Sequence, residues 1–174
     1  MKINIHTFFY GNNYGALLQS FFLKTFLKNE YKAKVNFNEY QPKKLLYREE
    51  IKPILRKNIF YSFLSIKKFF KLRKWKKEYI KSKPSNVFKE IPKEQNSLSF
   101  YGSDEIWNFN NPFFGFDPYF FGKSNNNIKF SYAASFGNGA TKVIPRELLF
   151  ELKDYFNNFK NISVRDLSSY NFLK

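Results

Sequence analysis

The first forty residues alternate between strand and helix patterns, and this alternation limits the possible folds more than any other feature of the sequence. Ile3 and Ile5 alternate with polar residues, which is typical of a short strand. After Asn12 and Asn13, both good helix caps, apolar residues recur at the spacing of one buried helical face; they are Leu17, Leu18, Phe21, Phe22, Phe26 and Leu27. Residues 35–37 return to alternation. Strand, helix and strand in this order predict the start of a parallel α/β sheet.

The alternation continues to the last residues. The runs SLSFYG (97–102) and IKFSYAASF (128–136) predict two strands, and NISVRD (161–166) predicts a short last one. Pro145 stands at the first position of a helical pattern, whose apolar face would consist of Leu148, Leu149, Leu152 and Phe156. The residues after 166 begin another helix. With 174 residues and 22% aromatic side chains, the chain suits one domain with a hydrophobic core.

Residues 43–83 differ from the rest in charge. They hold 15 Lys or Arg against 3 Glu, a net charge of +12 out of +16 for the whole chain. Phe63, Ile66 and Phe70 share one helical face, and a neighbouring stripe consists of Leu72, Trp75 and Tyr79. We therefore predict a basic amphipathic helical insertion, divided by Pro53.

The basic insertion has three interpretations that the residues leave open. It could bind nucleic acid, lie on an anionic membrane surface, or be a solvated face, which is the default for a charge run. Part of the charge also follows from the many residues that AT-rich codons encode. No helix-turn-helix, zinc-finger or RNA-binding motif accompanies the segment, so nucleic acid is the least favoured partner.

The chain has no Cys and one His, which excludes disulfides, thiol chemistry and a Cys/His zinc site. We expect no metal and no cofactor. The first residues lack the apolar run of a signal peptide, and no stretch is long and apolar enough to span a bilayer. We therefore expect a cytoplasmic protein, soluble or peripheral to the inner face of the membrane.

The loop Gly-Asn-Asn-Tyr-Gly (11–15) joins a predicted strand to a predicted helix. Free backbone N–H groups and the positive end of a helix dipole make such a loop an anion site. It lacks the glycine spacing of a dinucleotide site and the Lys-Ser/Thr of a P-loop. On pattern alone, a plain turn is the favoured interpretation.

Ser103, Asp104 and Glu105 follow the end of a predicted strand, where open α/β sheets carry their ligand-binding groups. Asp104 could act as a base, and Trp107 could stack on a sugar ring. The alternative is that Asp104 caps the next turn and Trp107 fills the core. Arg165, also at a strand end, could clamp a phosphate or carboxylate, or pair with a nearby Asp. His6 is predicted to be a packed or edge-strand histidine rather than a catalytic base.

Four of these segments resemble, in the same order, the N-terminal half of the polysaccharide pyruvyl transferase family. The segments are NNYGALLQSFFLKTFL (12–27), YGSDEIWN (101–108), KFSYAASFG (129–137) and NISVRD (161–166). The resemblance covers residues 1–174, and it is least supported in the insertion at 43–83.

The resemblance implies a Rossmann-like parallel sheet with flanking helices, similar to the N-terminal domain of a GT-B-type two-domain transferase. The C-terminal domain would be absent from this chain, the aromatic loop 112–121 would face it, and this half alone would be inactive. Family members transfer pyruvate from phosphoenolpyruvate to a sugar hydroxyl as a ketal, in the biosynthesis of exopolysaccharides and other surface glycans. The implied partners are a sugar or lipid-linked oligosaccharide acceptor and the missing domain or a partner chain.

The resemblance also implies a site. Asp104 would be catalytic, and the residues that bind substrate would be Asn13, Tyr14, Gly15, Ser103, Trp107 and Arg165. Phe9 stands where the family often has His, and Glu105 stands where it often has Gln. The alternative function is a non-catalytic basic module that binds an anionic membrane surface or nucleic acid through residues 43–83.

Overall fold

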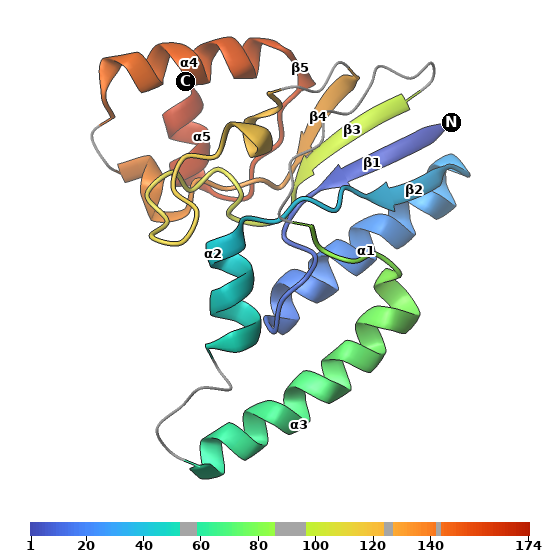
Figure 1. The fold of residues 1–174 in the computed structure, drawn as a ribbon. Coiled ribbons are helices and arrows are strands. Elements are labelled where there is room, and N and C mark those ends of the chain that lie inside the picture. Colours follow the sequence, from blue (N-terminus) through green and yellow to red (C-terminus); the bar gives the residue numbers. More distant parts are fainter. Residues whose placement is uncertain (53–58, 86–96, 124–126, 142–143) are drawn as a thin grey trace.

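The fold is described here from a computed structural model, which describes residues 1–52, 59–85, 97–123, 127–141 and 144–174. At its centre lies a sheet of five parallel strands in the order β2-β1-β3-β4-β5 (Figure 1). The strands are β1 (Lys2–His6), β2 (Lys34–Phe37), β3 (Ser97–Gly102), β4 (Ile128–Tyr132) and β5 (Phe159–Asn161). The parallel sheet with flanking helices confirms the predicted Rossmann-like α/β fold.

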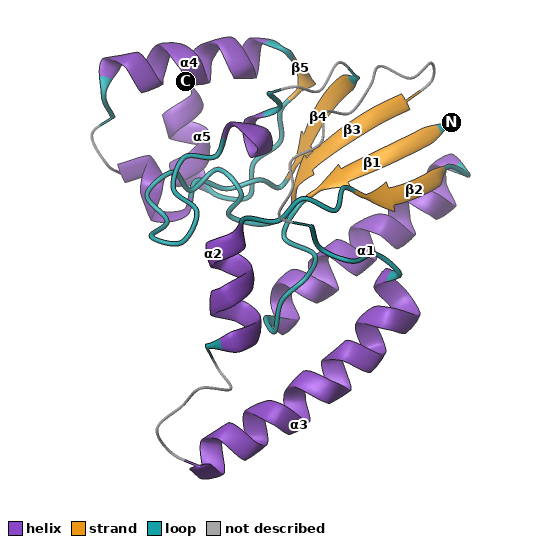
Figure 2. Ribbon diagram, in the orientation of Figure 1, coloured by secondary structure: helices purple, strands orange, loops and turns teal. Residues whose placement is uncertain are grey.

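Helices flank this sheet on both sides (Figure 2). They are α1 (Tyr14–Tyr31), α2 (Lys43–Leu46), α3 (Ile59–Trp75), α4 (Arg146–Asn157) and α5 (Leu167–Leu173). The helix predicted from Pro145 begins one residue later, at Arg146. The predicted last strand pairs at Phe159–Asn161, earlier than expected, and Val164 adds only a single bridge to Ala134.

One core lies between α1 and the sheet. Ile3 and Ile5 of β1 contribute side chains with no exposed surface, and Leu23 and Leu27 of α1 pack against them. The predicted helical face is correct for Leu17 and Leu27 but wrong for Leu18, Phe22 and Phe26, which are exposed. The α1 sequence is apolar on several sides, so its periodicity alone does not show which stripe is buried.

A second, larger core covers the opposite face of the sheet and consists mainly of aromatic side chains. Tyr119, Phe120 and Phe121, in a turn of 3-10 helix, are buried there against Phe136 and Phe159. The expectation that the loop 112–121 is exposed toward another domain is therefore wrong for this turn. Among the described residues, most exposed large apolar side chains lie on α1, α3, α4, α5 and β4, and a few lie on the helical turns that follow α2 and α3.

The insertion is helical, as predicted, and α3 lies on the outer side of α1, away from the sheet (Figure 1). The predicted break at Pro53 lies outside the described residues. Phe63 and Phe70 face solvent, which corrects the expectation that they lie on a packed face, whereas Leu72 is buried. Lys76 is also buried, and its Nζ donates to the carbonyl of Gly11 at 3.3 Å. This lysine ties the insertion to the Gly-Asn-Asn-Tyr-Gly loop.

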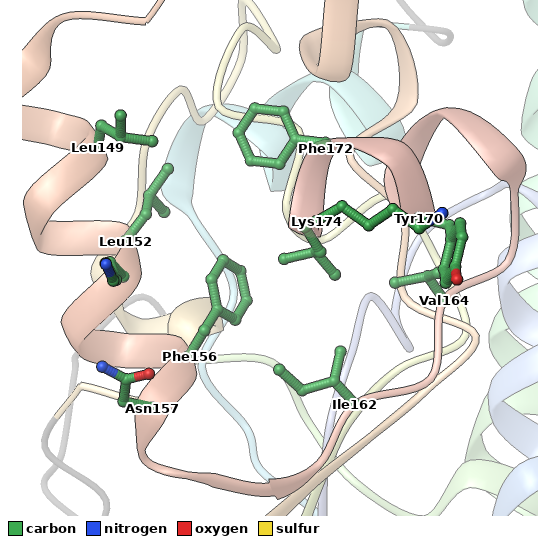
Figure 3. Close-up of a pocket in the computed structure, with 11 residues that line it drawn as sticks. Leu149, Leu152, Phe156, Asn157, Ile162, Val164, Tyr170, Phe172 and Lys174 are labelled. Atoms are coloured by element: carbon green, nitrogen blue, oxygen red, sulfur yellow. The ribbon is translucent and has the colours of Figure 1, made fainter.

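A cavity of about 590 Å³ opens between α4 and α5. Figure 3 shows Leu152 and Phe156 of α4 on one side, opposite Ile162, Val164 and Phe172. Its lining is mostly apolar, and it is formed by neither the loop after β1 nor the loop after β3. Among the described residues, no helix combines the length and apolar character that crossing a bilayer requires.

Candidate functional site

The carboxyl ends of β1 and β3 bring two loops together. These strands are neighbours, with Ile5 paired to Phe100 and His6 to Tyr101. In a parallel sheet, the loops that follow adjacent strands leave from the same edge, where α/β proteins bind ligands. The loop 7–13 and the loop 103–108 therefore form two walls of one site.

The first wall ends at the N-terminus of α1. Asn13 is extended, with φ −88° and ψ 109°, and its side-chain oxygen accepts hydrogen bonds from the N–H groups of Gly15 at 3.0 Å and Ala16 at 3.5 Å. This is the geometry of a helix cap, which satisfies two donors that have no partner within the helix. The positive end of the α1 dipole therefore points toward the site.

The second wall depends on an unusual backbone at the end of β3. Gly102 has φ +126°, and a side chain there would place its Cβ 2.4 Å from the carbonyl oxygen of Tyr132. Ser103, with φ +67°, donates its N–H to that same carbonyl at 2.6 Å. The Asp104 carbonyl accepts from the N–H of Ser135 at 3.1 Å. The loops after β3 and β4 are thus held together, with Asp104 at the edge of the sheet.

The cavity between the two walls has a volume of about 240 Å³. Asp104 and Glu105 line it together with Asn13, and Arg48 from the turn after α2 forms a third side. The Arg48 guanidinium lies 4.3 Å from the centre of the Phe113 ring. The cavity thus combines a cationic group, a helix N-terminus and two carboxylates, which is a set suited to binding an anion and moving a proton.

Glu105 and Arg165 separate this cavity from a neighbouring groove. An Arg165 nitrogen lies 3.5 Å from a Glu105 oxygen, and the Asn108 amide donates to the other Glu105 oxygen at 3.2 Å. The pair is partly exposed, so its contribution to stability is small, about 0–1 kcal/mol. Its effect on the site is to offset the negative charge of Glu105 beside the cavity.

The groove beyond the pair has a volume of about 480 Å³ and includes Ser103 and Arg165. The Ser103 hydroxyl is buried and has no hydrogen-bond partner among the described residues. Phe22 and Phe26 of α1 and Tyr132 of β4 form apolar parts of its lining. The groove therefore combines a guanidinium with an apolar surface.

The sequence of the chain matches the model of one protein family over most of its length. The sequence model described as "Polysaccharide pyruvyl transferase" matches residues 13–174. The chain belongs to the polysaccharide pyruvyl transferase family. Among curated proteins and among solved structures, no match is found.

The structure brings part of the predicted pyruvyl transferase site together. Asn13 and Asp104 line the cavity, while Ser103 and Arg165 line the adjacent groove. Gly15 lies in the first turn of α1, where its N–H is bonded to Asn13. Tyr14 turns away from the cavity toward α3, and the Nζ of Lys68 lies 4.5 Å from the centre of its ring.

Trp107 does not have the predicted position. Its side chain has no exposed surface, and its indole nitrogen donates to the carbonyl of Phe120 at 2.9 Å. An aromatic ring stacks on a sugar only if one of its faces is open, so the predicted sugar-binding role of Trp107 is corrected to a core role. For Asp104, the alternative is that it caps the next turn. The structure supports this, because the Asp104 Oδ1 accepts a hydrogen bond from the N–H of Glu105 at 2.8 Å.

Neither Phe9 nor His6 belongs to the lining of the cavity. Phe9, at the position that is often His in pyruvyl transferases, is buried and stacked on Phe37 with ring centres 4.9 Å apart. His6 is also buried, 2.9 Å from the hydroxyl of Tyr119, and burial together with nearby Lys129 lowers its pKa to about 3. His6 is thus a neutral packed histidine, as predicted.

Sequence reasoning missed Arg48. It was one of many cations in the insertion, and nothing in a run of lysines and arginines distinguishes the one that points at a site. The signal available was its spacing of three from Leu45, which puts both residues on one helical face and in the cavity lining. Among the described residues, no three His, Cys, Asp or Glu side chains are grouped as metal ligands would be.

Proposed function

We propose that this protein takes part in the transfer of pyruvate from phosphoenolpyruvate to a pair of sugar hydroxyls, forming a ketal and releasing phosphate. The observation that carries the proposal is the meeting of Arg48, the α1 N-terminus and Asp104 around one cavity, in a chain that belongs to the family. The site would serve the assembly of a surface polysaccharide, with a sugar or a lipid-linked oligosaccharide as acceptor.

The cationic side of the cavity suits the donor. Phosphoenolpyruvate carries a phosphate and a carboxylate, and both are anions that guanidinium groups and helix N-termini bind. Arg48 and the first turn of α1 approach the cavity from two sides. Asp104 and Glu105 oppose the binding of an anion, and Arg165 offsets the second of these charges.

The acidic side suits the proton transfers. In the overall reaction, both acceptor hydroxyls lose their protons and form C–O bonds to the central carbon of phosphoenolpyruvate. One proton goes to the methylene carbon, and the other leaves with the phosphate. Asp104 is the candidate base for an acceptor hydroxyl, because its Oδ1 is fixed by the Glu105 N–H at the rim of the cavity.

In a GT-B-like transferase, a second domain would complete the cleft beside this site. The test therefore uses the protein purified from the cells that make it, so that any further domain or partner is retained. Phosphoenolpyruvate is supplied with a panel of sugar acceptors, and both phosphate release and the mass of the glycan are measured.

We expect phosphate release that depends on the acceptor, with a pyruvate ketal on the product. Asp104→Asn should lower the rate by about 100-fold or more, since a positioned acid or base contributes about that much. The matched control is Asp154→Asn, an exposed carboxylate on α4. A protein that releases no phosphate with any acceptor, or an Asp104→Asn variant as active as the control, contradicts the proposal.

A further inference from the structure

A groove of about 370 Å³ runs between α1 and α3, on the side of α1 that faces away from the sheet. Leu17 and Leu72, both buried, belong to its lining, and Trp75 lies beside them. Phe21 holds the two elements together through ring contacts of 5.6 Å to Trp75 and 5.7 Å to Tyr79. The groove is therefore a formed feature of the fold rather than a gap between separate helices.

Large apolar side chains remain exposed along and beside this groove. Tyr14 and Leu18 line it from α1. Phe22, 62% exposed, lies beside it, where Leu18 and Phe22 also border the groove of Ser103 and Arg165. On α3, Phe63 and Phe70 point outward, and Phe70 is 60% exposed. Exposed apolar surface of this extent normally marks a place where another molecule binds.

Lysines alternate with these apolar groups. Lys67, Lys71 and Lys74 are exposed and follow one helical stripe of α3, and the last two line the groove. Lys67 lies over the ring of Phe63, 4.6 Å from its centre. Within residues 59–80 there are 7 Lys or Arg and a single acid, Glu78, which also lines the groove.

We propose that the α1–α3 groove and the outward stripe of α3 form a docking face for the surface of an anionic lipid bilayer. Positive charge suits the head-group phosphates, and each lysine near such a surface adds to binding. Aromatic and aliphatic side chains beside these lysines suit the boundary between head groups and acyl chains. The proposal concerns surface binding and does not depend on pyruvyl transfer.

The same observations argue against the other occupants. A second copy of the chain would bring another net charge of +16 to a face that is itself positive. A duplex nucleic acid would satisfy the lysines, but its phosphate backbone would leave Leu18, Phe22 and Phe70 without apolar contacts. The bases of a single strand stack on phenylalanine rings, so the test includes single-stranded RNA. A bilayer surface satisfies both kinds of side chain.

The test is co-sedimentation of the 174-residue chain with vesicles of phosphatidylcholine alone and of phosphatidylcholine mixed with phosphatidylglycerol. We expect binding to the mixed vesicles only, and weaker binding as salt is added. The triple variant Lys67→Glu, Lys71→Glu, Lys74→Glu should bind them roughly 100-fold more weakly. The control, which changes net charge equally, is Lys123→Glu, Lys153→Glu, Lys160→Glu; all six positions are exposed.

A second pair of variants tests the apolar part of the face. Leu18→Ser with Phe22→Ser should weaken binding to the mixed vesicles about tenfold, since each side chain loses apolar burial. The matched control is Phe150→Ser with Leu167→Ser, two exposed apolar positions on α4 and α5. Circular dichroism and thermal unfolding establish that each variant is folded.

Three results overturn the proposal. The first is equal binding to neutral and anionic vesicles, or no binding to either. The second is a lysine variant that binds as tightly as its control. The third is binding to duplex DNA that the lysine variant loses and the Leu18 and Phe22 variant keeps, or binding to single-stranded RNA that both variants lose, because these patterns belong to a nucleic-acid surface.

Discussion

His6 shows how a residue type that often performs chemistry becomes part of a core. It is the only histidine of the chain, it follows the pattern of β1, and it stacks on Tyr101 with ring centres 4.2 Å apart. Strand alternation places His6 on the same face as Asn4, opposite Ile3 and Ile5, so its burial follows from the aromatic core on that face and not from the pattern of β1. The family resemblance placed Asn13 and Asp104 at the site but not Arg48, because the motifs at strand ends leave a signal and a charge run does not.

The lowered pKa of His6 makes stability depend on pH. In the unfolded chain, the pKa of His6 is about 6.5. In the folded protein, burial and the nearby charge of Lys129 lower this pKa to about 3. Between these values only the unfolded state binds the proton, so stability falls as the pH falls. The raised pKa of Asp117 acts in the opposite direction.

Comparison with His6→Phe isolates the histidine, because Asp117 is present in both proteins. From pH 7 to about pH 5, wild type should lose about 2 kcal/mol of unfolding free energy more than the variant does. Urea unfolding at the two pH values measures this difference. If both proteins lose the same amount, the folded His6 is protonated more readily than its burial implies.

At the scale of elements, helix beginnings were more predictable than helix faces. Asn13 fixed the start of α1, because an asparagine cap has a local signature that does not depend on tertiary packing. Which sides of α1 and α3 are buried could not be read from the sequence. Both helices carry phenylalanines on several sides. The buried side of α1 is the one that packs on the sheet, and the insertion is held to the loop before α1 by the hydrogen bond from Lys76 to Gly11.

Loss of the Asn13 cap should destabilise α1 and the wall of the site that it forms. Asn13→Ala removes the acceptor of the Gly15 and Ala16 N–H groups, and it should lower the unfolding free energy by about 1 kcal/mol. Asn29→Ala, in the exposed last turn of the same helix, is the control and should cost nothing. Equal effects in chemical unfolding would show that the cap does not hold the helix.

At the scale of the molecule, the order of strands and helices was predictable, and so was the parallel sheet. The reversal of strand order that places β3 beside β1 brings loops about 90 residues apart to one edge, at the kind of position where open α/β sheets bind ligands. The fate of the aromatic loop was not predictable. Tyr119, Phe120 and Phe121 have no period, yet they pack into the core on the face of the sheet opposite α1.

The central claim is that the cavity at this edge binds phosphoenolpyruvate, and titration calorimetry with phosphoenolpyruvate tests it most directly. The wild-type protein should bind phosphoenolpyruvate, and inorganic phosphate should compete for the same cavity. Arg48→Gln should weaken binding about tenfold or more, since a charged hydrogen bond is lost. The control Arg73→Gln, an exposed arginine of α3, should bind as wild type does. Equal affinities in all three proteins, or no binding heat in any, would contradict the account.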